Sequence, residues 1–231
     1  MTIRLTLVCG HTTNGTADTV FGHGTLRGDG LHEAGAGLSA TPLRTPTVRS
    51  PSNCCALTSA ALGLKTTVDP ALRDIDYGMW RGRTMAEVAA ADPHGLSAWL
   101  TDPDAAPHGG ESVRQLCHRA AHWLNSLPHQ TGGAVAVAEP AVVKALLVHA
   151  LSAPARAFWR IEAPPLYIVS LMRRDDGWSV RPVDGSFPSE VVLHPSHRHA
   201  DHSRRLVGRQ GSHRSRDGAE QWLVRVPPAR R

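Results

Sequence analysis

The stretch IRLTLV at residues 3–8 decides the fold, because we interpret it as a mainly apolar, buried strand. Such runs are typical of strands buried on both faces, as in the centre of a parallel sheet. The same theme returns late in the chain in GAVAVAEPAVVKALLVHAL at 133–151, which reads as a buried strand, a turn at Glu139-Pro140 and a helix. Two strands of this kind indicate an α/β protein rather than an all-β one.

The segments between these two strands alternate in the same way. Residues 111–127 place apolar side chains on one helical face, with Glu111 expected in the first turn, where a carboxylate suits the helix dipole. We therefore predict a three-layer, doubly wound fold: a mostly parallel sheet with helices on both faces. The other expected elements are a helix at 31–40, a short strand within 45–52, a helix at 54–64, two helical pieces in 83–103 separated at Pro93, and a hairpin over 166–183 with an Asp-Gly turn at 176–177.

Polar and reactive residues follow three of the expected elements. Residues 9–13, 52–55 and 139–140 all come directly after a strand. In open α/β sheets the binding crevice lies outside the carboxyl ends of the strands. These three segments are therefore expected to surround one pocket.

The positive charge of the chain is confined to its end. Residues 190–231 hold nine arginines against four acids, whereas residues 1–189 carry sixteen basic and sixteen acidic side chains. We predict one folded domain at 1–189 and a flexible, Arg- and His-rich basic tail at 190–231, which has too little apolar content to order itself. Through charge alone the tail could contact nucleic acid non-specifically.

No apolar run is long enough for a membrane helix, and the first residues lack the apolar core of a signal peptide. We expect a cytoplasmic protein without membrane contact. The four cysteines show neither CxxC spacing nor the density of a disulfide framework, and Cys117 is expected to be a small buried hydrophobe.

Residues 3–185 resemble the histidine phosphatase superfamily, which has the phosphoglycerate-mutase-like fold, and in particular its small bacterial branch that includes alpha-ribazole phosphatases. The segment LRDIDYGMWRGRTMAEV at 72–88 looks like that branch's LREIDFGxWEGxTxxEV marker. PHGGES at 107–112 resembles its PGGES turn, and Ser50-Pro51 with Thr58 is similar to its SPLxRAxQT segment. The resemblance implies phosphatase relatives and a pocket at the sheet end.

The catalytic positions implied by the resemblance are substituted. In the register of the family's Arg-His-Gly motif, Cys9 takes the place of the arginine, Gly10 that of the nucleophilic histidine and His11 that of the glycine. The second phosphate-holding arginine falls on Cys54, and the second histidine falls on Glu139. The resemblance thus implies a remodelled site.

A phosphoryl site needs fixed cations or oriented N–H donors to balance its negative charge, and these loops offer no arginine. Only the proton-donor carboxylate keeps its chemistry, as Asp74. We expect a protein without phosphohistidine phosphatase activity that binds an unknown small molecule or protein partner. The expected pocket residues are Cys9, Gly10, His11, Cys54, Asp74, Glu111 and Glu139.

Two alternatives remain open. Two thiols, an imidazole and a carboxylate form a plausible ligand set for zinc or another soft transition metal, in this case Cys9, His11, Cys54 and Glu139. Decay of the site also explains the substitutions, since arginine to cysteine is a single-base change.

The second alternative is an enzyme of the same fold. A turn slipped by one residue would make His11 the nucleophile of a residual phosphomonoesterase. A repurposed activity would instead pair Cys9 or Cys54 with His11, with Asp74 and Glu139 as general acid and base. The catalytic candidates are then His11, Asp74 and Cys9.

Several remaining residues have structural interpretations. His149 is interpreted as a packed histidine and Lys144 is expected to face solvent. The tryptophans at apolar positions are assigned to the core: Trp80, Trp99, Trp123 and Trp159.

Overall fold

The structure, a computed structural model, describes residues 3–10, 21–22, 45–128, 133–174 and 177–182. These residues belong to the first of two units into which the chain divides, Met1–Phe187. The helix expected at 31–40, the Asp-Gly turn residue 176 and the tail at 190–231 lie outside the described residues, as does His11.

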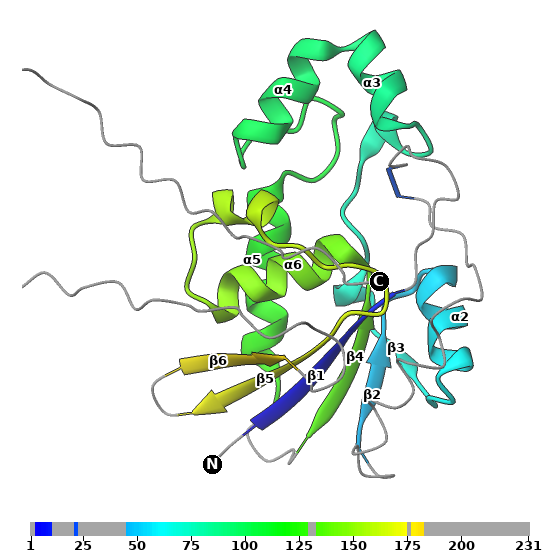
Figure 1. Cartoon of the computed structure of the whole chain (residues 1–231), viewed down its shortest axis with the longest axis vertical. Coiled ribbons are helices and arrows are strands. Elements are labelled where there is room, and N and C mark those ends of the chain that lie inside the picture. The colour runs from blue at the N-terminus through cyan, green and yellow to red at the C-terminus, as the bar shows by residue number, and fades with distance from the viewer. Residues whose placement is uncertain (1–2, 11–20, 23–44, 129–132, 175–176, 183–231) are drawn as a thin grey trace, which may run out of the picture. The chain divides into compact units, whose positions relative to one another are not determined.

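The described strands form one mixed sheet with the order β3-β2-β4-β1-β5-β6 (Figure 1). Four neighbouring strands are parallel: β1 (Ile3–Cys9), β2 (Thr47–Arg49), β3 (Thr67–Val68) and β4 (Ala134–Ala138). The hairpin of β5 (Ile168–Arg174) and β6 (Gly177–Pro182) continues the sheet in antiparallel pairing beside β1. The predicted mostly parallel sheet and the predicted hairpin are both confirmed.

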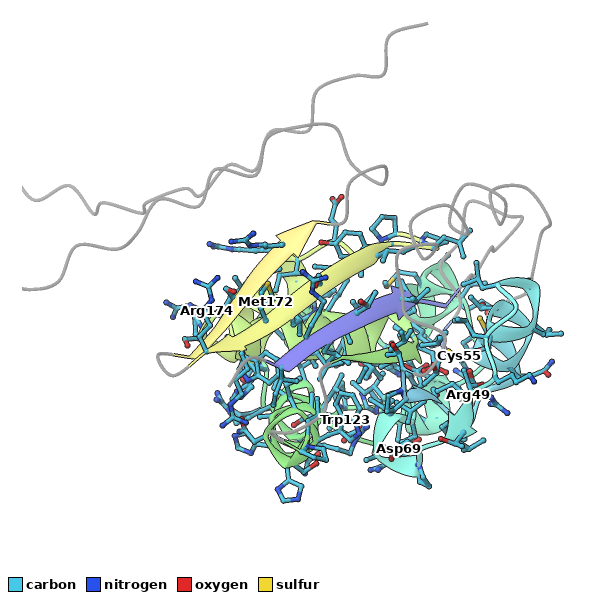
Figure 2. The ribbon with its side chains drawn as sticks, turned by 90° about the horizontal axis from the view of Figure 1, so that it is seen from below. Arg49, Cys55, Asp69, Trp123, Met172 and Arg174 are labelled. Atoms are coloured by element: carbon cyan, nitrogen blue, oxygen red, sulfur yellow. The ribbon has the colours of Figure 1, made fainter. Side chains whose placement is uncertain are left out.

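Helices cover both faces of this sheet, which confirms the predicted three layers. Leu5 and Leu7 point to the face packed by α5 (Val113–Ser126) and α6 (Pro140–Ala150). Val8, Val135 and Val137 point to the opposite face, where they pack with Cys55 of α2 (Asn53–Ala61). The side chain of Cys55 can be followed in Figure 2.

The helical pieces over 83–103 are separated at Pro93, as predicted. The first is α3 (Met85–Ala91), which begins with a capping box between Thr84 and Glu87. The second is α4 (Pro93–Thr101), whose N-cap Asp92 accepts a hydrogen bond from the Gly95 N–H. Both helices lie beyond the carboxyl ends of the parallel strands (Figure 1).

Three short 3₁₀ segments complete the frame: η1 (Pro70–Leu72), η2 (Gly78–Trp80) and η3 (Ala155–Arg160). Trp123 of α5 anchors the start of η1, since its indole Nε1 donates to Asp69 Oδ2 over 2.7 Å (Figure 2). Trp80, Trp99 and Trp123 are buried, as is Cys117, in agreement with their predicted core positions. Among the described residues no helix is long and apolar enough to cross a membrane.

Candidate functional site

A cavity of about 720 Å³ lies where β2 and β4 end. One side is formed by the turns after these strands and the other by the segment between η1 and η2 together with α3, α4 and η3. Of the predicted pocket residues, Cys54, Asp74 and Glu139 line it. The further lining residues used below are Ser50, Arg73, Asp76, Tyr77, Arg81, Trp99, Lys144, Phe158 and Trp159, with Phe21 beside them.

Glu139 is a buried carboxylate at the start of α6. It occupies the N-cap position, but its side chain makes no capping hydrogen bond and is only 5% exposed. Its Oε1 accepts a hydrogen bond from Ser50 Oγ over 2.9 Å, and its Oε2 is buried without a hydrogen-bond partner among the described residues. A buried oxygen in this state is costly, which marks the position as one shaped for something other than stability.

Asp74 is the second acid of the cavity and lies between η1 and η2. Its Oδ1 accepts a hydrogen bond from the Ile75 N–H over 2.9 Å. Burial, followed by the negative charge of Glu139, raises the pKa of Asp74 from its ordinary value of 3.8 to about 8. At neutral pH the Asp74 carboxyl group therefore retains most of its proton.

Glu111 does not line the cavity, which corrects its predicted place in the pocket. It also precedes the helix it was expected to start, because α5 begins at Val113 after a capping box between Ser112 and Gln115. Glu111 instead accepts two hydrogen bonds from Arg119, at 2.9 Å to Oε1 and 2.7 Å to Oε2.

Arg119 joins this pair to the segment that carries Asp74. Its guanidinium also donates to the backbone oxygens of Ala71 and Arg73, at 2.8 and 2.9 Å. Glu111 therefore acts on the cavity indirectly, by fixing the arginine that holds the Asp74 segment in place.

Cys9 lies beneath the cavity rather than in its lining. It is fully buried at the end of β1, and its Sγ donates a hydrogen bond to the Ala163 oxygen over 3.5 Å. Burial raises the pKa of the Cys9 thiol, which favours the neutral thiol over the reactive thiolate.

Gly10 approaches the first turn of α2 closely. Its N–H donates to the Ala138 oxygen over 2.7 Å. A β-carbon at this position would lie 3.0 Å from Cys55 Sγ and 3.4 Å from Cys54 Sγ. The space beside Gly10 is thus filled by the two thiols.

The two neighbouring thiols differ in character. A hydrogen bond with the Cys55 side chain lowers the pKa of Cys54, whereas the same bond raises the pKa of Cys55. Cys54 lines the cavity, and Cys55 packs under the sheet. The four cysteines all lie within the described residues, and none of them forms a disulfide bond there.

Aromatic rings form a further part of the cavity lining. Phe21 lies 5.0 Å from Tyr77 and 5.7 Å from Trp99 between ring centroids, and Trp99 lies 6.0 Å from Trp159 at 89°. Trp159 and Trp99 therefore line the cavity as well as packing on each other. Assigning them to the core alone missed this second role.

Lys144 also lines the cavity, so the expectation that it faces solvent is wrong. Its Nζ lies 5.6 Å from the ring centroid of Phe158, and burial lowers the pKa of its ammonium group. The cause is the packing of η3 against α6, a contact between segments that the sequence pattern does not reveal. Ser50 was equally missed as a partner of Glu139, although its Ser-Pro pair had been noted.

The predicted metal set receives no support from the described part of the chain. Within that part no group of three or more His, Cys, Asp or Glu side chains is placed to hold a metal ion. The fourth ligand of the predicted set, His11, is outside the described residues.

Comparison with known proteins places these features in a family context. The model of the histidine phosphatase superfamily (branch 1) matches residues 33–184. A bifunctional protein of Mycobacterium tuberculosis is 35% identical over 109 residues, which are 46% of this chain and 30% of that protein. The glucosyl-3-phosphoglycerate phosphatase of the same species is 39% identical over 97 residues, 39% of this chain and 43% of that one. The matched stretches thus span less than half of these relatives' lengths.

Solved structures agree in fold. A mycobacterial glucosyl-3-phosphoglycerate phosphatase superimposes with a TM-score of 0.65 at 22% identity, over 80% of this chain and 100% of that chain. YhfR of Bacillus stearothermophilus gives a TM-score of 0.70 at 21% identity, over 80% and 98%. With the family model matching well over half of its residues, the chain belongs to the histidine phosphatase superfamily.

Proposed function

We propose that this member of the superfamily binds a small organic molecule in the cavity and does not carry out phosphohistidine-based phosphate transfer. The observation that carries the proposal is Glu139, a buried carboxylate at the end of β4 with Asp74 beside it in the same cavity. A phosphate ester would bring its negative charge to the most acidic part of the cavity.

The cations around the cavity do not offset this charge. Arg81 pairs with Asp76 at 3.1 Å, and Arg73 lies 3.8 Å from Glu111, with more than half of each arginine side chain exposed. Lys144 faces the ring of Phe158. The described residues thus provide no buried arginine pair to hold phosphoryl oxygens, which is the arrangement such a transition state needs.

The surroundings of Gly10 support the same proposal. The resemblance assigns Gly10 to the place of the nucleophilic histidine, and any side chain there would meet the thiols of Cys54 and Cys55. A β-carbon at this position would require the Cys55 thiol to shift by a few tenths of an ångström. The names of the relatives favour the competing function, phosphatase activity, which in this chain would act through His11.

Turnover of p-nitrophenyl phosphate separates the two functions. We expect the full chain to show no hydrolysis above that of a His11→Ala variant purified in parallel. An Asp74→Asn variant serves as the second control, because it removes the acid that would protonate a leaving group. Hydrolysis that both substitutions abolish would overturn the proposal.

A further inference from the structure

We propose that the ligand of this cavity is an organic cation, a substituted ammonium group on an apolar body, held by the Glu139 carboxylate and the surrounding aromatic rings. This inference rests on the proposed function, because it names the class of molecule that the cavity takes. It extends beyond the phosphate esters suggested by the names of the relatives.

The two acids of the cavity have few close partners among the described residues. Glu139 is only 5% exposed. Its single side-chain hydrogen bond among the described residues comes from Ser50. Neither Glu139 nor Asp74 forms an ion pair within 4.0 Å inside the described ranges. A buried carboxylate without a compensating charge favours a cation in the space that it faces.

The aromatic wall supplies the second half of the site. Phe21, Tyr77, Trp99, Phe158 and Trp159 all line the cavity. Ring faces attract ammonium groups, and the attraction grows when the cation is removed from water. Lys144 already demonstrates this preference within the cavity, since its ammonium group lies over the Phe158 ring.

Lys144 does not compete for the acids, because it forms no ion pair with Glu139 in the described structure. The main effects on its own pKa, besides burial, come from Cys9 and Glu162. The acidic pair and the lysine therefore act as separate features, and a ligand cation has its own place beside Glu139.

The test compares two molecules of nearly the same shape, choline and its uncharged counterpart 3,3-dimethylbutan-1-ol. Isothermal titration calorimetry on the full chain at low ionic strength should show choline binding at least about tenfold more tightly. Equal affinities, or tighter binding of the alcohol, would overturn the inference.

Substituted variants then show which residues cause the difference between the two affinities. Glu139→Gln keeps the shape of the side chain and should bring the ratio of the two affinities close to one, whereas Asp104→Asn, an exposed acid outside the cavity lining, should leave it unchanged. Trp159→Leu should weaken choline more than the alcohol, and it remains informative if Glu139→Gln does not fold. A ratio that survives Glu139→Gln in folded protein, or Trp159→Leu, contradicts the proposed site.

Phenyl phosphate completes the design. If it binds more tightly than both uncharged and cationic probes and p-nitrophenyl phosphate is hydrolysed, the proposed function itself fails. If the alcohol binds as well as choline and phenyl phosphate does not bind, the proposed function stands and the assignment to cations alone fails.

Discussion

Asp74 illustrates how one side chain at the cavity couples stability to protonation. In the folded chain its carboxyl group keeps its proton up to a pH of about 8, while in the unfolded chain it ionises near 3.8. The folded state therefore binds more protons between these values, and the free energy of unfolding falls as pH rises through this window. Above a pH of about 8 the loss of unfolding free energy caused by Asp74 no longer changes with pH.

Replacing Asp74 with asparagine should remove this pH dependence. Asparagine cannot ionise, so the variant escapes the cost of a buried charge. Its free energy of unfolding should be close to that of the wild type at pH 4 and higher by more than about 1 kcal/mol at pH 9. Urea titrations at both pH values measure the difference. The charges that act on Asp74 from neighbouring elements, and so shift the midpoint, are those of Glu139, Arg81 and Arg119.

Asp76 provides a control of opposite sign. Hydrogen bonds from the Gly78 N–H and from Arg81 lower the pKa of Asp76, so its charged form stabilises the fold. Asp76→Asn should therefore be less stable than the wild type at neutral pH, and the deficit should shrink on acidification. The same pH response from both substitutions would argue against the Asp74 assignment.

At this scale the sequence predicted which residues gather at the sheet end but not how each is oriented. Cys54, Asp74 and Glu139 line the cavity, as the strand-end argument expects. Cys9 does not, because it shares the strand face of Leu5 and Leu7 and packs inward with them. The place of Glu111 depends on a partner eight residues along the chain, which no local pattern reveals.

Among the elements, the pairing of α5 with the segment between η1 and η2 is what positions the second acid. Arg119 and Glu111 are 14% and 10% exposed, and the arginine also binds backbone oxygens on both sides of Leu72. A charge-assisted contact at this depth is stronger than one at the surface.

We expect Arg119→Ala to lower the free energy of unfolding by about 2–4 kcal/mol, because it removes the donor of the hydrogen bonds to Glu111 and to the backbone oxygens of residues 71, 73 and 74. Chemical denaturation measures this loss. Arg114→Ala on the same helix removes an exposed pair with Asp104 and should change the midpoint little. Similar losses from both substitutions would show that the Arg119 contacts carry no special weight.

Helix boundaries were predictable where the sequence contains residues that start or end helices. Pro93 separates α3 from α4 as expected, and Gly63 closes α2 with φ +66°. The packing of η3 on α6 was not predictable, because the sequence pattern of neither segment indicates a contact with the other. Because of that contact Lys144, which was expected at the surface, lines the cavity.

For the whole molecule, the sequence predicted the architecture because continuous apolar strands and amphipathic helices leave few alternatives to a layered α/β fold. The basic surplus of the chain belongs to residues 190–231. We propose that this tail contributes nothing to the stability of the preceding residues.

Ending the chain at Ser189 should therefore shift the melting temperature by less than about 2 °C. Isoelectric focusing of the shortened protein should show a clear fall in isoelectric point, since nine arginines are removed with four acids. Differential scanning calorimetry gives the first quantity. A larger loss of melting temperature would mean that part of the tail belongs to the folded domain.

The thiols beside Gly10 also constrain how this protein could change over generations. A β-carbon at residue 10 would lie 3.0 Å from Cys55 Sγ, so any larger residue there requires this thiol to shift by a few tenths of an ångström. A substitution at residue 10 should therefore be tolerated better together with a smaller residue at position 55. The two positions are coupled, so the side chain that one of them accepts depends on the other.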